Sequence, residues 1–198
     1  MILSSLYLAP VEYYSALFRS KNALIEINEN YKKQSYRNRC IIAGTNGPLS
    51  LSIPIQKPIK TKSKIKDIRV ANHGNWQHLH WNAIVSAYSS TPFFQYYEDD
   101  FRPFYEKQID FLHDYNEELR IMICRFIGID TNVTYTDRYI IENEEGFLDL
   151  REKIHPKKKS EFKTEPYYQV FAEKHGFLNN LSIIDLIFNM GNESRLFL

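Results

Sequence analysis

The stretch YRNRCIIAGTNGPLSLSIPI, residues 36–55, decides the architecture of the N-terminal half, because it holds two strand patterns on either side of a turn. Arg39–Ala43 and Pro48–Ile55 are the expected strands, and GTNG between them predicts a hairpin. Apolar and polar residues alternate along the second strand, so one of its faces is expected to lie against the core. Pro54 is then expected at an edge or at the end of that strand.

Further strands are expected on both sides of this hairpin. Ile2–Leu8 is apolar enough for a buried strand, Glu12–Phe18 suits a short helix, and Ala23–Ile27 is a second strand. After the hairpin and a basic connection, Ile68–Val70 is expected to be one more strand. These elements predict a mixed or mostly antiparallel sheet in the N-terminal half.

The middle of the chain has helical periodicity. Asn75 is the expected N-cap of a helix that runs to about Tyr88, with Leu79 and Ile84 on its buried side. The strongest pattern is Glu117–Ile127, where apolar residues recur every three or four positions until a glycine that suits a helix end. A short strand is expected soon afterwards, at residues 133–135.

The C-terminal segment GFLNNLSIIDLIFNMG, residues 176–191, predicts a well-capped helix that docks on the core. Ser182 at the N-cap and Asp185 three residues later have the spacing of a capping box, and Gly191 ends the helix. Asp185 is therefore expected to have a structural role, with a catalytic role as the alternative. Together the patterns predict one α+β domain over residues 1–198.

Composition restricts the classes of partner. A net charge of +1 gives no global field that favours nucleic acid, so an anion site would have to be local. Cys40 and Cys124 lack metal-site spacing and are expected to be buried thiols in a reducing compartment. The N-terminal apolar run is short and has no basic flank. We therefore expect a cytoplasmic chain with no membrane span and no nucleic-acid partner.

Several catalytic and cofactor motifs are missing. The sequence has no glycine-rich dinucleotide or P-loop motif, and no G-x-S-x-G, H-E-x-x-H or C-x-x-C. His78 and His80 would point about 200° apart on a helix, so they cannot share one metal ion. We expect no metal site, and the sequence does not identify a cofactor.

The basic stretch YKKQSYRNRC, residues 31–40, is the candidate anion site. If it is extended, Arg37 and Arg39 lie on one face, where their guanidinium groups could converge on a carboxylate, a phosphate or a diphosphate. Tyr31 and Lys33 could add donors from the preceding turn, and Asn38 lies on the other face. The alternative is that Arg39 makes a buried pair with a carboxylate of the protein while the lysines face water.

Two residues of the following helix complete the candidate site. His80 could project into a cleft beside Trp81 and act as general base, although a hydrogen-bonded interior histidine is the alternative. Tyr88 and Trp81 could pack on the face of a sugar or a nucleotide. The polar segment Ile154–Pro166 is either a mobile lid over a site or a solvated connection.

Several segments occur in an order that resembles the WbqC-like family: YLAPVEYYSALF (7–18), NYKKQSYRNRC (30–40), LSIPIQK (51–57), WQHLHWNAIVSAYSSTPFF (76–94) and GFLNNLSIIDLIFNMGN (176–192). The resemblance covers nearly the whole chain, although the first segment lacks the Gln-Pro-Tyr-like turn expected there. The residues that match motif positions are Tyr31, Lys33, Asn38, Arg39, His80, Tyr88, Asp185 and Asn189.

The resemblance implies a role in bacterial surface-polysaccharide (O-antigen) biosynthesis, with glycine or aminoacyl transfer as the suggested activity. The expected partner is an anionic small molecule, either a nucleotide-sugar or an acyl or aminoacyl donor. In this hypothesis Lys33, Arg37 and Arg39 hold the charged group, and His80 removes a proton from the attacking amine. The alternative function is a non-catalytic module that binds a metabolite or a partner enzyme of a glycan pathway.

Overall fold

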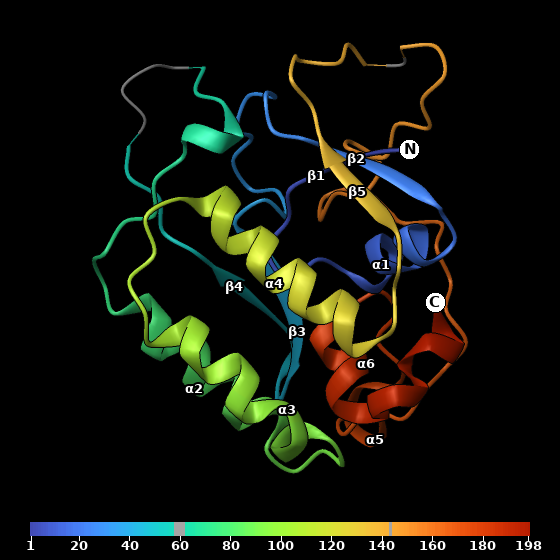
Figure 1. Cartoon of the computed structure of the whole chain (residues 1–198). Coiled ribbons are helices and arrows are strands. Elements are labelled where there is room, and N and C mark those ends of the chain that lie inside the picture. Colours follow the sequence, from blue (N-terminus) through green and yellow to red (C-terminus); the bar gives the residue numbers. More distant parts are fainter. Residues whose placement is uncertain (58–61, 143) are drawn as a thin grey trace.

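The computed structural model describes residues 1–57, 62–142 and 144–198, and it confirms the α+β class. The described strands divide into two small sheets, one parallel and one antiparallel, with helices packed around them (Figure 1). The strands therefore pair in two different ways, and the two sheets position different sets of polar side chains.

The first sheet is parallel throughout. β1 (Ile2–Ser4), β2 (Asn22–Glu26) and β5 (Asn132–Tyr135) lie side by side in the order β1-β2-β5. Between the first two strands, helix α1 (Val11–Phe18) carries the chain back across the sheet, which is what parallel pairing requires. All three strands consequently end at the same edge of the sheet.

A short segment around Asp149 extends this sheet on the free side of β1. It pairs in parallel with Ile2, whose N–H donates to Leu148 O (2.9 Å) and whose carbonyl accepts from Leu150 N (3.0 Å). The chain that leaves this segment therefore starts at the same edge as the chain that leaves β1, β2 and β5. This pairing brings residues after position 150 beside residues from the first 30.

The second sheet is the predicted hairpin. β3 (Arg39–Gly44) and β4 (Gly47–Ser52) are antiparallel, and the turn uses Gly47 at φ +104°. The second strand ends before Pro54, as its missing N–H predicts. The strand expected at 68–70 is reduced to two isolated bridges, which join Val70 to Ile55 and Arg69 to Phe111.

The helices cover the sheets and follow the predicted periodicity with shifted ends. They are η1 (Ile65–Asp67), α2 (Trp76–Tyr88), α3 (Phe94–Phe101), η2 (Arg102–Tyr105), α4 (Leu112–Phe126), α5 (Ala172–His175), α6 (Ile183–Met190) and η3 (Gly191–Phe197). α4 begins five residues before the predicted Glu117 because Leu112 and Tyr115 continue its buried face. Leu79 is an error of the prediction: it is 60% exposed, since the buried face of α2 runs through Trp76, His80 and Ile84.

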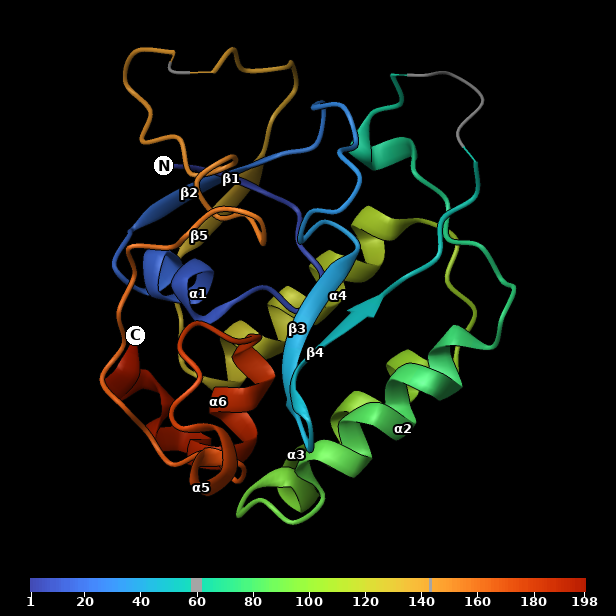
Figure 2. The same ribbon diagram turned by 180° about the vertical axis from the view of Figure 1, so that it is seen from behind.

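The C-terminal helix α6 is docked, as predicted, and it is buried along nearly its whole length. Its N-terminal end is held by two backbone hydrogen bonds, from Ser182 N to Ile41 O (2.8 Å) and from Ile183 N to Ala9 O (2.9 Å). α6 therefore lies against both β3 and the start of α1, which Figure 2 shows from behind. The C-terminal helix therefore packs against the same core as the first residues of the chain.

The predicted capping box is wrong. Ser182 does occupy the N-cap, but its hydroxyl donates to Leu8 O (2.7 Å) and makes no cap hydrogen bond. The side chain of Asp185 points into the interior, where it is 0% exposed. The reason is burial: the start of α6 has protein on all sides, so both side chains have tertiary partners that a solvated helix end would lack.

Two further predictions concern the cysteines and the membrane. Cys40 and Cys124 are free and buried, which confirms the prediction that both thiols are buried. Within the part of the chain that the structure describes, no helix has both the length and the apolar character needed to cross a membrane.

Candidate functional site

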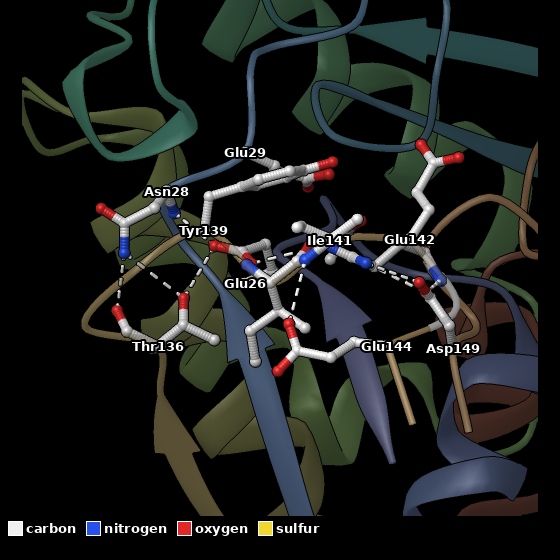
Figure 3. A network of polar contacts seen from close by, with 12 residues as sticks. Glu26, Asn28, Glu29, Thr136, Tyr139, Ile141, Glu142, Glu144 and Asp149 are labelled. Carbon is white, nitrogen blue, oxygen red and sulfur yellow. Dashed lines mark hydrogen bonds and ion pairs between the residues drawn. The ribbon is translucent and has the colours of Figure 1, made fainter. Parts of the chain in front are cut away.

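The shared edge of the parallel sheet collects polar and charged side chains from four segments of the chain. β1 ends at Ser4, β2 ends at Glu26 and is followed by Asn28 and Glu29, and β5 is followed by Thr136. Figure 3 shows Glu26, Asn28 and Thr136 side by side where the strands end. In parallel sheets, ligands bind in the crevice outside the carboxyl ends of the strands. The candidate site therefore begins at this edge.

Glu26 is the centre of one buried cluster and has four hydrogen-bond donors. It is 0% exposed, and its Oε1 accepts from Asn28 N (2.7 Å) and from the Thr136 hydroxyl (2.7 Å). Its Oε2 accepts from Ile140 N (2.8 Å) and from Nη1 of Arg151 (3.4 Å). The carboxylate thus ties β2 to the chain that follows β5 and to the chain that follows the Asp149 segment.

Arg151 balances the charge of Glu26 from the other side. The guanidinium is buried and is held by Asp149, through Nε to Oδ1 (3.0 Å) and Nη2 to Oδ2 (2.5 Å), while Nη1 also donates to Ile140 O (2.7 Å). Burial alone would lower the pKa of Arg151, but Asp149 outweighs it and leaves that pKa raised. The group remains a fixed positive charge.

A second buried pair, Arg37 with Glu29, lies beside the first. Arg37 is 1% exposed, and its Nε and Nη2 donate to the two carboxylate oxygens of Glu29 at 2.9 and 2.5 Å. Nη2 also approaches Ser4 Oγ (3.0 Å) and Glu152 Oε1 (3.3 Å). This geometry is the paired, planar contact that arginine makes with carboxylates.

A cavity of about 110 Å³ opens between these clusters. The side chains that surround it include Glu29, Lys32, Tyr139, Glu142, Arg151 and Glu152. Lys32 is paired with Glu152 (2.8 Å) and lies 3.7 Å from Glu142. Since Arg151 is already balanced by Glu26 and Asp149, the carboxylates around the cavity outnumber the cations left to neutralise them.

The carboxylate of Glu152 stays ionised at neutral pH. Burial would raise its pKa, but the hydrogen bond from Lys32 and the charge of Arg37 outweigh burial, so the pKa is lowered. An ionised carboxylate can accept hydrogen bonds from hydroxyl or ammonium groups. The cavity is therefore suited to an uncharged polar group or an amine, and it disfavours an anion.

The structure does not give Arg37 and Arg39 a shared ligand site. Arg37 is occupied by Glu29, Ser4 and Glu152, whereas Nε of Arg39 donates to Ser52 Oγ (3.0 Å) in the hairpin. The expected alternation fails because β3 begins only at Arg39, so Arg37 precedes the strand and turns inward. The buried pair that the alternative assigned to Arg39 is made by Arg37.

The other residues of the basic stretch lie nearer the surface. Lys33 is exposed, and Tyr31 is half-buried, with a pKa that burial raises and that Arg37 and Arg39 partly lower. The phenol of Tyr31 therefore lies within electrostatic range of both guanidinium groups. Asn38 holds the base of the hairpin, because its Nδ2 donates to Ile53 O (2.7 Å).

His80 lies in the interior rather than in an open cleft. It is 5% exposed, and its Nδ1 lies 3.0 Å from the Tyr7 hydroxyl. Burial lowers its pKa to about 4, although the Ser52 backbone partly opposes this. The hydrogen-bonded interior histidine that the sequence left open is the state observed, and its role as general base stays a prediction.

Tyr88 and Asp185 belong to one buried cluster that joins α2, α6 and β3. The Tyr88 hydroxyl donates to Asp185 Oδ1 (3.0 Å) and accepts from Ala43 N (3.1 Å). Asp185 Oδ2 accepts from Tyr167 (2.7 Å) and from Gln169 (2.8 Å). Burial raises the pKa of Asp185 more than these three donors lower it.

Asn189 is the fifth member of this interior group, one helical turn after Asp185. Its Nδ2 donates to the backbone carbonyl of Asp185 (2.7 Å), and it is 2% exposed. Tyr88, Asp185 and Asn189 are thus surrounded by protein. For Tyr88 this position does not suit stacking on a sugar or nucleotide.

The segment 154–166, a lid or a connection in the sequence analysis, lies against the basic stretch. Lys157 donates to the side chain of Gln34, and the Ser160 hydroxyl donates to Glu12 Oε2 (2.8 Å). Ile154 is buried. The segment is therefore tied to the N-terminal part of the chain through the side chains of Lys157 and Ser160.

The acids and the second arginine of this site were not predicted from the sequence. Glu26 and Glu29 stand in ALIEINEN, where an acid interrupts an apolar strand run, and this was the available signal. Arg151 and Glu152 had no signal, because only the pairing of Asp149 with Ile2 brings them to the sheet edge. Among the described residues, no three histidine, cysteine or acidic side chains are grouped so that they could hold a metal ion.

Comparison with known proteins gives a family. A family model described as the WbqC-like protein family matches residues 5–161, which include Glu26, Glu29, Arg37, Arg151 and Glu152. The uncharacterised protein Rv1507c of Mycobacterium tuberculosis is 24% identical over 220 residues, covering 98% of this chain and 94% of that protein. No solved structure matches the chain significantly.

Proposed function

Because the chain belongs to the WbqC-like protein family, we propose that it is a transferase that binds a small polar acceptor at the carboxyl ends of the parallel strands. The observation that carries the proposal is the set of buried charges around the cavity there: Glu26, Glu29, Arg37 and Arg151 are each less than 5% exposed. Buried ion pairs contribute little net stability, so stability alone does not explain why several of them occur together at this edge. Their place at this edge supports a ligand-binding role.

The chemistry proposed is transfer of an acyl or aminoacyl group to an amine, in keeping with the family resemblance. The acceptor amine binds as a cation between Glu29, Glu142 and Glu152, and one of these carboxylates takes its proton. The neutral nitrogen then forms a bond to the carbonyl carbon of the donor, the bond from that carbon to the leaving group breaks, and the leaving group departs with the bonding electron pair and takes up the second proton of the nitrogen. An amino sugar of a surface polysaccharide is the acceptor class that fits this step.

The exposed part of the basic stretch would bind the donor. Lys33 follows Lys32, which borders the cavity, and Tyr31 lies within electrostatic range of Arg39. A phosphate or carboxylate of an anionic acyl or aminoacyl donor would lie against these groups. Arg37 contributes indirectly, because its charge keeps Glu152 ionised.

The experiment is a ligand screen followed by a turnover assay. Thermal shift against nucleotide-sugars, aminoacyl donors and coenzyme A identifies a donor, and transfer to glucosamine is then measured. We expect Glu152→Gln to lower turnover at least about tenfold, which corresponds to about 1.4 kcal/mol. The matched control is Glu165→Gln, an exposed acid outside the site. Equal turnover in both variants would contradict the proposal.

His80 provides the competing assignment of the general base. Nδ1 lies against the Tyr7 hydroxyl, so as a base His80 would use Nε2, with Nδ1–H donating to that hydroxyl. If His80→Gln abolishes turnover while ligand binding survives, the histidine is the base and the carboxylates only bind. If turnover survives in His80→Gln and falls in Glu152→Gln, the carboxylates carry the proton transfer.

The second candidate function is a non-catalytic binding or scaffolding module. It is favoured by Glu26, whose two oxygens already have four donors from the protein, as expected of a structural centre. A ligand that stabilises the protein but is not turned over with any tested acceptor would support the module. Turnover that depends on Glu152 would exclude it.

A further inference from the structure

Lys32 already occupies the position that the proposed acceptor amine would take. Its Nζ lies 2.8 Å from Glu152 Oε1 and 3.7 Å from Glu142 Oε1, and all three side chains border the cavity at the sheet edge. An alkylammonium group of the protein is therefore held by two of the carboxylates to which the proposed function assigns the acceptor.

The side chain of Lys32 can leave this position while its backbone stays in place. The side chain is 44% exposed, whereas that of Arg151, which also borders the cavity, is 2% exposed. The Ser35 hydroxyl donates to Lys32 O (2.6 Å), and the preceding Tyr31 N donates to Ser63 O (2.9 Å), so the backbone is held on both sides. Rotation about the side-chain bonds is therefore enough to release the ammonium group.

The contacts of Lys32 are also weak enough to be exchanged. Ion pairs between partly exposed side chains contribute little, because water screens them and holding a long side chain costs entropy. Arg37 differs, since it is 1% exposed and donates to both carboxylate oxygens of Glu29. The guanidinium groups of Arg37 and Arg151 are thus fixed cations, and the ammonium of Lys32 is an exchangeable one.

The size of the cavity favours exchange over joint binding. Its volume of about 110 Å³ lies below the range of ordinary small-molecule pockets, which begins at about 300 Å³, so it admits one group of a ligand and not a whole ring. A second cation beside Glu142 and Glu152 would meet the like charge of Lys32. Exchange of one ammonium group for another keeps the number of charges constant and leaves both carboxylates paired.

We propose that Lys32 is a displaceable internal ligand, and that the ammonium group of a primary amine replaces it between Glu142 and Glu152. This inference rests on the proposed function and names the group that the site recognises. A primary ammonium gives a carboxylate both a hydrogen bond and a positive charge, whereas an acetylated amine offers the hydrogen bond alone. The affinity for the amine is then set partly by the competition with Lys32.

Binding of glucosamine to Lys32→Met tests the exchange. Methionine keeps most of the side-chain length and removes the competing ammonium, so the Kd from the shifts of the Tyr139 and Glu152 amides should fall about fivefold. A merely structural role of Lys32 would instead weaken binding. The matched control is Lys62→Met, which removes the same charge from an exposed residue next to Ser63 and should leave the Kd unchanged.

The ε-methylene signal of Lys32 reports the displacement itself, and its absence from Lys32→Met assigns it. In the unmodified chain this signal should shift with the same saturation as the Tyr139 and Glu152 amides when glucosamine is added. N-acetylglucosamine, which lacks the ammonium charge, should give no saturable shift of any of these signals.

The outcomes separate this inference from the proposed function. If glucosamine binds Lys32→Met no more tightly than the unmodified chain, or if the Lys32 signal stays in place while the amides saturate, the exchange is wrong and the transferase proposal stands. Equal binding of N-acetylglucosamine would overturn the assignment of the primary ammonium. If glucosamine binds neither protein, the proposed function fails, and the exchange fails with it.

Discussion

Two buried acids, Glu29 and Asp185, have different kinds of partner: a cation for Glu29 and neutral hydrogen-bond donors for Asp185. This difference distinguishes a candidate binding site from a structural centre. Glu29 faces the guanidinium of Arg37, so a full charge meets a full charge beside a cavity. Asp185 accepts hydrogen bonds from two tyrosines and a glutamine, all of them neutral, in the interior around α6. The interior needs neither a cation nor a cavity, whereas the sheet edge has both.

The consequence is a difference in what each region contributes. Neutral donors around one carboxylate join α2, α6 and β3 and so hold the fold together. A buried ion pair gives little net stability compared with apolar residues of the same size, so stability alone does not explain its retention. Four experiments test this comparison.

The largest effect is expected from breaking the ion pair on one side. Arg37→Met leaves Glu29 buried without its partner, which should lower the free energy of unfolding by about 3–5 kcal/mol. Arg37→Met/Glu29→Met removes both charges, and most of this loss should be recovered. Urea unfolding measures both. If the double variant is as unstable as the single one, the pair stabilises the fold and the comparison fails.

The next effect is a pH dependence from His80. Its pKa is about 4 in the folded protein against 6.5 normally, so between these values the unfolded chain binds a proton that the folded chain does not. The contribution of His80 to the free energy of unfolding should be fully present above pH 6.5, and it should fall by about 3 kcal/mol as the pH drops to 4. Relative to His80→Gln, in which this proton is absent, the fall should be visible in urea unfolding. If the free energy of unfolding depends on pH in the same way in both proteins, His80 is not held neutral in the fold.

A smaller loss is expected at the interior centre. Tyr88→Phe removes a donor from Asp185 and an acceptor from Ala43 N, which should lower the free energy of unfolding by about 1–3 kcal/mol. Ligand binding at the sheet edge should be unchanged, because Tyr88 does not border the cavity. If the variant folds normally but no longer binds ligand, Tyr88 contributes to binding, as predicted from the sequence.

The smallest change in stability is expected at the surface. Arg39→Ala loses one hydrogen bond to Ser52 Oγ, and the free energy of unfolding should change by about 0.5 kcal/mol or less. If Arg39 binds an anionic donor, the thermal shift caused by that donor should shrink nonetheless. An unchanged shift would exclude Arg39 from the donor site.

Local patterns predicted most of the elements. The hairpin, α2, α4 and the docked α6 follow from alternation, periodicity and turn residues, which act over short stretches. The parallel pairing of β1 with β2 did not follow, because strand direction depends on how α1 packs and not on the strands themselves. The segment around Asp149, too short to be a strand by pattern, was missed for the same reason.

The candidate site was harder to predict because charge pairing is a tertiary property. Two arginines in YRNR look equivalent along the sequence, yet one is buried with Glu29 and the other bonds to Ser52 at the surface. Their difference depends on where β3 begins and on the acid that lies opposite. His80 was read correctly only in its alternative form, as an interior group.

The central claim is that the acid-rich cavity at the carboxyl ends of the parallel strands is a ligand site, and an NMR titration with glucosamine tests it most directly. We expect saturable shifts of the backbone amides of Tyr139 and Glu152, weakened in Glu152→Gln and unchanged in Glu165→Gln. No saturable shift at these residues, or one that Glu152→Gln leaves undiminished, would contradict the claim.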